Sequence, residues 1–246
     1  MIKDKVAIIT GASSGIGYAT ALALSKAGAK VAIGARRVDR LEELAKKISA
    51  DGGEVFYQKL DVTQRSECEN FAKAVLEKWG SIDILVNNAG LMPLSLFKSL
   101  KVDEWDRMID VNIKGVLYCT GSVILHMKEK KSGHIVNLSS VAGRTVFPTG
   151  TVYCATKHAI TAFSEGLRQE FSARSNIRVT SIEPGVVATE LTDTITDESL
   201  QGFIENAKKM ETLQAKDIAN AILYAVESPS HVNVNEVLIR PTTQER

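Results

Sequence analysis

Short apolar runs alternate with amphipathic stretches along the whole chain. Seven runs of four to six residues are rich in Val and Ile. Several of them are apolar at successive positions, as in strands that helices cover on both faces. The runs are Val6–Ile9, Lys30–Ile33, Val55–Leu60, Ile82–Val86, His134–Leu138, Arg178–Ile182 and Glu236–Ile239.

Helical patterns occupy the segments between these runs, and glycines such as Gly28 and Gly80 follow two of them as stop signals. The predicted helices are Gly15–Ala27, Arg40–Ile48, Ser66–Trp79, Val102–Lys130, Val152–Arg174 and Lys216–Val226. Strand–helix alternation of this kind predicts an α/β fold, a doubly wound parallel sheet of about seven strands with helices on both faces. No linker or low-complexity tract interrupts it, so we expect a single domain over residues 1–246.

One polar segment, Val186–Gln214, departs from the alternation. It has no strand pattern, and only Leu200, Phe203, Ile204 and Ala207 give it a weak helical period. A long insertion between a strand and a helix of a compact domain is often functional. We therefore expect a substrate lid at about residues 186–214, with a surface helix of no special role as the alternative.

Composition narrows the class of protein further. The 246 residues carry a formal net charge of +1, with 44% hydrophobic and 24% charged residues, which excludes disorder and gives no global field for nucleic acid or an anionic membrane. No apolar run approaches the ~18 residues of a membrane span, and no signal peptide is recognisable. The three cysteines lack metal-ligand or disulfide-scaffold spacing. These features predict a cytoplasmic protein with no metal, membrane or nucleic-acid partner.

A glycine-rich turn joins the first predicted strand to the first helix. Gly11, Gly15 and Gly17 stand in the sequence TGASSGIG, a longer loop than GxGxxG. Glycine at such a turn lets the backbone approach a pyrophosphate, whose charge faces the helix N-terminus. The pattern predicts a dinucleotide site, and the alternative is a plain strand–helix turn.

The second predicted strand ends at Arg36 and Arg37, where sites for NAD usually carry an acidic residue on the ribose 2′-OH. Two guanidinium groups at this place could bind a 2′-phosphate through paired N–H donors. We therefore predict NADP(H) rather than NAD(H). The alternative is two solvated arginines at the start of a helix.

Two polar segments close predicted strands and a third opens a helix thirteen residues after Ser140. Because ligands bind at the carboxyl ends of parallel strands, we expect all three at the same mouth of the sheet. They are Asn87–Gly90, Asn137–Ser140 and Tyr153–Lys157. Tyr153 and Lys157 lie four residues apart and share one helix face. An ammonium nearby favours the phenolate, so Tyr153 could exchange protons as acid or base, while Ser140 could donate to a developing alkoxide.

At this point the chain resembles the short-chain dehydrogenase/reductases over its full length. The matching motifs are TGASSGIG at 10–17, Asp61 in LDVT, NNAG at 87–90, Asn112 in DVNIKG, NLSSVAG at 137–143, YCATK at 153–157 and PGVVAT at 184–189. The resemblance implies a Rossmann-type fold. It also implies an NADP(H)-dependent oxidoreductase that reduces a ketone or aldehyde to an alcohol by hydride transfer, or the reverse.

The resemblance also implies the roles of single residues. The catalytic set is Asn112, Ser140, Tyr153 and Lys157, with Tyr153 as acid/base, Ser140 orienting the carbonyl and Asn112 holding a relay water with Lys157. Lys157 also lowers the pKa of the tyrosine and holds the nicotinamide ribose. The cofactor-binding set is Gly11, Ser13, Ser14, Gly15, Ile16, Gly17, Arg36, Arg37, Asp61, Val62, Asn88, Ala89, Gly90, Tyr153, Lys157, Pro184, Gly185, Val187 and Thr189.

Substrate contacts are expected from an apolar wall. It comprises Leu91, Met92, Pro93, Leu94, Val141, Arg144, Val146, Phe147, Val186 and the lid, together with Ser140 and Tyr153. The tail from His231 to Thr242 resembles that of bacterial serine and 3-hydroxy acid dehydrogenases and small-aldehyde reductases. The only charge in the wall, Arg144, could pair with a substrate carboxylate, and the alternative is a surface arginine. Glu183, before Pro184, has no evident role.

Several alternatives stay open from the sequence. Within the reductases, 3-oxoacyl reduction competes with 3-hydroxy acid or aldehyde chemistry. A silent NADPH-binding scaffold or sensor is a second class, although such proteins typically lose the tyrosine or the lysine. The two long predicted helices are apolar on more than one face, which together with the resemblance predicts a homotetramer, a dimer of dimers.

Overall fold

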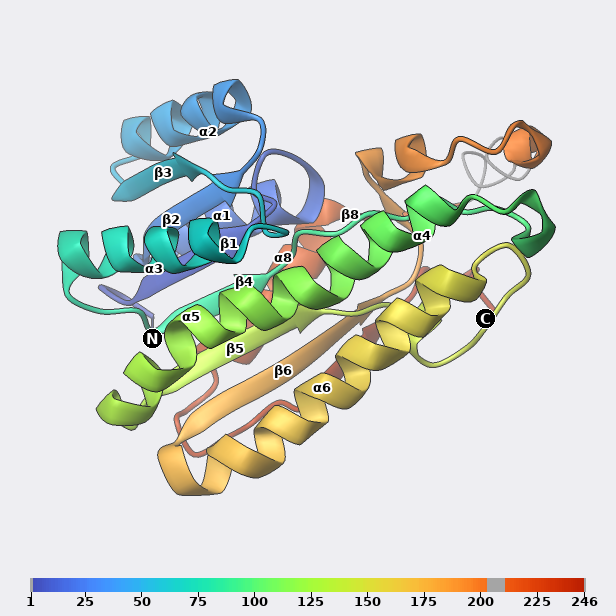
Figure 1. Ribbon diagram of the computed structural model, residues 1–246. Helices are drawn as coiled ribbons and strands as arrows, with labels where there is room; N and C mark the ends of the chain where they lie inside the picture. The colour runs from blue at the N-terminus through green and yellow to red at the C-terminus, as the bar shows by residue number, and fades with distance from the viewer. Residues whose placement is uncertain (1, 203–210, 246) are drawn as a thin grey trace.

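Seven parallel strands form the centre of the computed structural model, which describes residues 2–202 and 211–245 (Figure 1). Every neighbouring pair of these strands is parallel. The spatial order is β3 (Val55–Lys59), β2 (Lys30–Ala35), β1 (Val6–Thr10), β4 (Ile84–Asn87), β5 (Gly133–Leu138), β6 (Ile177–Pro184) and β9 (Glu236–Ile239). The predicted doubly wound sheet is confirmed, with each predicted strand present and bounds that differ by up to two residues.

Helices cover both faces of the sheet, because successive strand residues point to opposite sides. Ile9 belongs to the cluster under one helical layer, and its neighbour Ile8 belongs to the cluster under the other. The first layer contains α1 (Gly15–Lys26), α2 (Val38–Ala50) and α8 (Ala215–Glu227). The second contains α3 (Arg65–Trp79), α5 (Gly115–Lys130) and α6 (Thr151–Ser175), which lie in front of the sheet in Figure 1.

The long helix predicted at Val102–Lys130 contains a change of pitch. The structure has α4 (Val102–Ile109), a turn of π-helix at Asp110–Lys114, and then α5, joined without a break. Asn112 lies inside the π-turn and is buried. Single π-turns within α-helices occur often at functional sites, and no hydrophobic periodicity reveals them.

By length and composition alone, this same helix is long and apolar enough to cross a membrane, although no membrane span is predicted from the apolar runs of the sequence. The inner side of α5 packs on β4, β5 and α3. Part of its apolar surface therefore belongs to the protein core, and its outer side carries exposed Leu117 and Leu125.

The segment predicted as a lid contains two short strands, contrary to the expectation of no strand. β7 (Val187–Ala188) pairs in parallel with β8 (Leu213–Gln214), so the two ends of the segment are tied together. Between them the structure describes 3₁₀ turns at Glu190–Thr194 and Glu198–Leu200. Leu200 is buried, while the other positions of the weak helical pattern, Phe203, Ile204 and Ala207, lie outside the described residues.

Two of the cysteines, distant in sequence, meet in the core. Cys68 on α3 and Cys119 on α5 are both buried, and their sulfur atoms are 3.5 Å apart as a thiol–thiol contact. All three cysteines of the chain are free thiols. Cys68 and Cys119 thus form a close thiol pair and not a disulfide. Their spacing in the sequence could not reveal this pair.

Candidate active site

The site lies where the sheet changes direction, at the carboxyl ends of β1 and β4. β1 pairs with β2 on one side and with β4 on the other, so the connections that leave this point run to opposite faces. Thr10, the last residue of β1, accepts hydrogen bonds on its hydroxyl from the backbone N–H groups of Asn88 and Ala89, each at 3.0 Å. The glycine loop and the NNAG segment are therefore held together as one unit.

Two of the loop glycines, Gly11 and Gly17, are required by close contacts within that unit. Gly11 has φ +66°, and a Cβ there would lie 2.8 Å from the Ala89 Cα. A Cβ on Gly17 would lie 2.4 Å from the Asn88 side-chain nitrogen, which donates to the carbonyl groups of Thr10 and Gly11. The loop backbone is thus pressed against its support, with the N-terminus of α1 directly behind it.

The PGVVAT segment reaches the glycine loop from the end of β6. A Cβ on Gly15 would lie 3.1 Å from the Thr189 methyl carbon, so these two predicted cofactor residues are neighbours. The Thr189 hydroxyl accepts a hydrogen bond from the Leu191 N–H and begins the Glu190–Thr194 turn. The same segment is anchored behind by Gly185 N–H, which donates to the Ile239 carbonyl at 2.7 Å.

Arg37 lies over the glycine loop. Its guanidinium donates to the Ser13 hydroxyl at 3.1 Å and to the Ser14 hydroxyl at 2.8 Å, and it forms an ion pair with Glu190 at 2.8 Å. Ser13, Ser14, Gly15, Tyr18, Arg40, Glu43 and Glu190 line a pocket of about 360 Å³ beside it. Arg36 is exposed and forms no ion pair with another residue in the described part of the chain, so the two predicted arginines differ.

The predicted adenine residues sit after β3. Asp61 is partly buried, and its carboxylate accepts from the N–H and the hydroxyl of Thr63 at 3.0 and 2.8 Å. Val62 is buried against Gly115, where a Cβ would lie 2.7 Å from the valine methyl carbon. The turn is thus fixed between its own hydrogen bonds and the start of α5.

The predicted catalytic side chains converge at the carboxyl end of β5 and the first turns of α6. Tyr153 and Lys157 are both buried, and the ammonium lies 5.7 Å from the centre of the phenol ring. Lys157 donates to the Leu138 carbonyl at 2.7 Å. The Ser140 hydroxyl, at the edge of burial, accepts from the Ala142 N–H at 3.1 Å and donates to the Pro184 carbonyl at 3.3 Å, close to Tyr153. Ser139 instead bonds to the Lys157 carbonyl and to Thr161, so its hydroxyl is structural.

Burial governs the ionisation of this cluster. It raises the pKa of the Tyr153 phenol to about 12, and the hydrogen bond with Ser140 opposes that rise. It lowers the pKa of the Lys157 ammonium to about 8. The prediction that the ammonium holds the pKa of Tyr153 below its ordinary value is wrong for this structure, because desolvation of the buried phenolate is the largest influence on that pKa and raises it.

Asn112 contacts the same cluster from the π-turn. Its side-chain amide donates to the Leu91 carbonyl at 2.9 Å and to Thr156 at 3.2 Å, and its oxygen accepts from the Leu91 N–H. A Cβ on Gly90 would lie 3.4 Å from that oxygen and 3.9 Å from the Lys157 nitrogen. The side chain is therefore used to hold the loop after NNAG, beside the lysine.

An apolar cluster borders Tyr153, the predicted catalytic tyrosine, as the predicted substrate wall requires. Met92 packs on its edge, and its N–H donates to the Thr194 hydroxyl of the lid segment at 3.1 Å. Val146 instead is 77% exposed. Val186 is held outside the cluster by bonds with Gln244 and Leu213. The buried members are Leu91, Leu94, Met108, Ala142, Tyr153, Cys154 and Leu200.

Arg144 does not fit the hypothesis of a substrate carboxylate. Its guanidinium donates to both oxygens of Glu183, at 2.7 and 3.2 Å, and also pairs with Glu236. Glu183 is completely buried and accepts a further bond from Ser181. Two carboxylates of this chain, those of Glu183 and Glu236, thus already pair with the guanidinium. This corrects the expectation for Arg144 and gives Glu183 a structural role.

Comparisons with known proteins identify the family. The model of the short chain dehydrogenase family matches residues 5–200. The chain belongs to this family. An uncharacterized oxidoreductase of Staphylococcus saprophyticus is 50% identical over 244 residues, which are 99% of this chain and 98% of that protein.

Two solved structures of short-chain dehydrogenases are similar to the whole chain. The closed form of a serine dehydrogenase complexed with NADP+ is 34% identical with a TM-score of 0.91, covering 98% of this chain and 96% of that chain. An alcohol dehydrogenase from the archaeon Thermococcus sibiricus, complexed with 5-hydroxy-NADP, is 33% identical with a TM-score of 0.88 and covers 99% of both chains.

Three charged residues of this dehydrogenase site were missed in the sequence. Arg40 and Glu43 reach the pocket beside Arg37 from the first turns of α2, and Glu190 reaches it from the lid segment. Arg40 and Glu43 follow the Arg36–Arg37 pair at helical spacing, so the sequence pattern could have indicated them. Glu190 lies 153 positions after Arg37, and no local pattern connects them.

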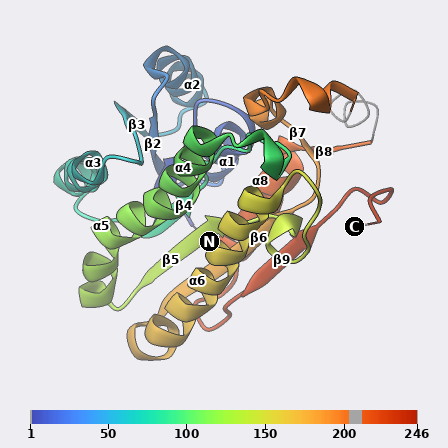
Figure 2. The same cartoon turned by 45° about the vertical axis from the view of Figure 1, so that its right-hand side comes forward.

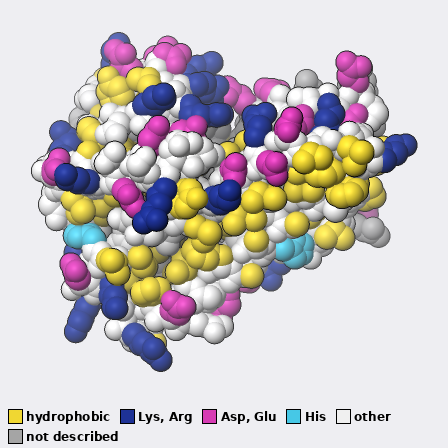
Figure 3. Space-filling model, in the orientation of Figure 1, with side chains coloured by type: hydrophobic (Ala, Val, Ile, Leu, Met, Phe, Trp, Pro, Cys, Tyr) yellow, Lys and Arg dark blue, Asp and Glu magenta, His cyan; other side chains and the backbone are white. Residues whose placement is uncertain are grey.

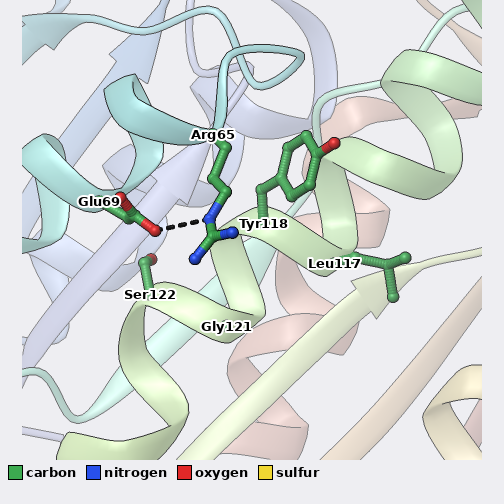
Figure 4. A pocket seen from close by; sticks show the side chains of 6 residues that line it. All are labelled: Arg65, Glu69, Leu117, Tyr118, Gly121 and Ser122. Carbon is green, nitrogen blue, oxygen red and sulfur yellow. Dashed lines mark hydrogen bonds and ion pairs between the residues drawn. The ribbon is translucent and has the colours of Figure 1, made fainter.

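A second pocket of about 210 Å³ lies between α3 and α5 (Figure 4). Its walls carry the Arg65–Glu69 ion pair and the side chain of Tyr118. None of the predicted catalytic or cofactor residues lines it. The catalytic cluster and the glycine loop therefore define the candidate active site.

Proposed function

We propose that this short-chain dehydrogenase uses NADP(H) to reduce a ketone or aldehyde to an alcohol, or to run the reverse. One observation carries the proposal: buried Tyr153 lies beside Ser140 and Lys157, at the sheet edge that bears the glycine loop. An acid, a carbonyl-orienting donor and a dinucleotide loop at one sheet edge are the groups that carbonyl reduction needs.

The residues present fit the dinucleotide. Arg37 already holds an anion, the carboxylate of Glu190, and its guanidinium also donates to the Ser13 and Ser14 hydroxyls, which have O–H donors of their own. The same donor set suits a 2′-phosphate, which the glycine loop would place next to it. Gly11, Gly15, Gly17 and Ile16 would bind the pyrophosphate, Asp61 and Val62 the adenine, and Asn88, Ala89, Gly90, Pro184, Gly185, Val187 and Thr189 the remainder.

The bound nicotinamide supplies the hydride, and the side chains handle the proton and the orientation. Ser140 orients the substrate oxygen, and Tyr153 gives it a proton. With a pKa of about 12 in this structure, the phenol keeps its proton throughout the neutral range and is a ready donor to an alkoxide. Lys157 holds the nicotinamide ribose, and a water between Lys157 and Asn112 would return a proton to the tyrosine.

The substrate proposed is a small 3-hydroxy acid or the corresponding aldehyde. The likeness to a serine dehydrogenase over the whole chain supports this class. The alternative is 3-oxoacyl reduction, which the apolar cluster beside Tyr153 and the internal pairing of Arg144 favour. Initial rates with 3-hydroxy acids, small aldehydes and 3-oxoacyl esters separate these classes, since a 3-oxoacyl enzyme gains rate as the acyl chain lengthens.

The cofactor proposal is tested by fluorescence titration with NADPH and NADH. Arg37→Ala should weaken NADPH binding about tenfold, which corresponds to ~1.4 kcal/mol, and leave NADH binding unchanged. Arg36→Ala measures the contribution of the neighbouring exposed guanidinium. Equal losses for both dinucleotides in Arg37→Ala would contradict the assignment.

We also propose a homotetramer that pairs the outer faces of α5 and α6. Figure 3 shows hydrophobic side chains gathered along these helices, and Leu117 and Leu125 are 41% and 66% exposed. Gly121 and Gly166 leave open space on the two helices, which permits close helix approach. Light scattering that returns the mass of a monomer would refute this assembly.

The proposed location is the cytoplasm. Its support is the three buried cysteines, which form no disulfide with one another. Reduced, buried thiols are typical of reducing compartments. Fractionation of cells that produce the full chain tests the location.

A further inference from the structure

We infer that Glu190 is a specificity-determining residue, because its carboxylate occupies the phosphate-binding position on Arg37 and must leave when a 2′-phosphate arrives. The inference rests on the proposed use of NADP(H). It adds a competitor from this chain itself, located on the lid segment and outside the glycine loop.

The contacts of Arg37 carry this inference. One guanidinium nitrogen donates to Ser14 at 2.8 Å and to Glu190 at 2.8 Å, and the same nitrogen lies 3.1 Å from the Ser13 hydroxyl. Carboxylate and phosphate oxygens use the same guanidinium N–H donors. The internal anion and an incoming 2′-phosphate therefore compete for one set of hydrogen bonds.

The surrounding charges indicate that Glu190 and a 2′-phosphate compete for Arg37 and do not bind it together. The hydrogen bonds from Arg37 and Ser14, and then the charges of Arg37 and Arg40, hold the pKa of Glu190 below its ordinary value, so the carboxylate is ionised at neutral pH. Glu43 lines the same pocket and adds a second negative charge. A 2′-phosphate beside an ionised Glu190 meets repulsion as well as a lost donor.

The position of Glu190 couples this competition to the lid segment. Glu190 is the first residue of the 3₁₀ turn that ends at Thr194. At the other end of that turn, the Thr194 hydroxyl accepts from the Met92 N–H in the predicted substrate wall. Figures 1 and 2 both place this segment beside the start of α4, across the end of the sheet. When Glu190 leaves Arg37, the end of the turn nearest the phosphate site is therefore released. The other end of the same turn contacts the predicted substrate wall through Thr194.

The test is a set of titrations of wild type and Glu190→Gln, an isosteric change that removes the charge. An exposed ion pair contributes about 0.2–1 kcal/mol, so NADPH should bind the variant roughly 1.5- to 5-fold more tightly. NADH affinity should stay unchanged. Adenosine 2′,5′-bisphosphate and AMP serve as fragments, and only the bisphosphate should gain affinity, a readout that general loosening of the loop would not give.

Glu43→Gln is the matched control. It removes the same charge from the same pocket, but the hydrogen bonds of the Arg37 guanidinium go to Ser13, Ser14 and Glu190. Its effect on NADPH should therefore be smaller than that of Glu190→Gln. Equal gains in both variants would show a diffuse field and overturn the specific role of Glu190.

The outcomes separate this inference from the proposed function. If wild type binds neither dinucleotide, or prefers NADH, the proposed cofactor is wrong. If wild type prefers NADPH and Glu190→Gln binds it equally or more weakly, the cofactor assignment stands and the competition is refuted. Circular dichroism of each variant shows that the fold is retained.

Discussion

The catalytic cluster and the arginine cluster occupy the same edge of the sheet but are built on opposite principles. Tyr153, Lys157 and Asn112 are buried, and hydrogen bonds to fixed backbone groups hold the lysine and the asparagine. Arg37 and Glu190 are each 44% exposed and hold each other by charge. The first arrangement fixes the positions of its side chains. In the second, another anion can readily take the place of Glu190 on Arg37.

The difference indicates which property of the enzyme each region controls. Buried groups pay a desolvation cost that moves their pKa values, and such shifts suit proton transfer. An exposed ion pair contributes about 0–1 kcal/mol and yields readily to a competing ligand. Substitutions around the site should therefore leave the type of reaction unchanged. A change of a single exposed charge should instead alter the preference for one cofactor over another.

The largest effect should come from the buried region. Tyr153→Phe removes the proposed proton donor and keeps the ring, so we expect kcat to fall by roughly 10²- to 10⁴-fold. NADPH should still bind, because the glycine loop and Arg37 are untouched. Steady-state rates alongside fluorescence titration check both halves, and wild-type turnover in Tyr153→Phe would remove the tyrosine from the mechanism.

The two ion pairs of the site should differ in their contribution to stability. Arg144→Ala leaves the fully buried Glu183 without its cation, so we expect the free energy of unfolding to fall by about 3–5 kcal/mol. Glu190→Gln breaks only an exposed pair, and its cost should stay below about 1 kcal/mol. Urea denaturation of both variants measures the contrast.

A double variant makes that contrast sharper. Arg144→Ala combined with Glu183→Gln removes the stranded charge and should recover part of the lost stability. No recovery would mean that the packing of the arginine side chain, and not the buried charge, supports this part of the fold.

The buried lysine should also give a pH dependence of stability. Lys157 has a pKa of about 8 in the folded protein and ~10.4 in an unfolded chain. The unfolded chain binds the extra proton between these values, so this group makes the protein more stable as pH rises from about 8 to 10.4, by about 3 kcal/mol in total.

Lys157→Met should abolish this contribution. The difference in unfolding free energy between wild type and variant should then change over that pH window and be flat below it. Lys128→Met on α5, an exposed position, is the control. A constant difference at all pH values would contradict the buried, depressed lysine.

The fold was largely readable because burial on both faces leaves a direct trace in the sequence. Val31 and Ile33 are apolar at alternate positions and Ala32 between them is also buried, so the strand stands out. The glycine loop was readable for a similar reason, since Gly11 and Gly17 are demanded by contacts that no side chain could share.

What the sequence could not reveal depends on contacts between distant segments. Glu183 and Arg144 are 39 positions apart, and only the folded sheet shows that one satisfies the other. The π-turn around Asn112 keeps a helical hydrophobic pattern, so its altered hydrogen bonding is silent. The pKa of Tyr153 was misjudged because spacing along a helix gives the neighbour of a group but not its desolvation.

The buried cysteines of this protein, the close thiol pair among them, can report the local opening of its packed elements. Cys68, Cys119 and Cys154 are all buried, so a thiol reagent can reach none of them without a transient separation of packed elements. The first two lie between α3 and α5, next to the turn that carries Val62, to whose carbonyl the Cys68 thiol donates. Labelling rates at these cysteines therefore measure the free energy of that opening. Ligand that binds the closed form must slow the labelling, by mass action.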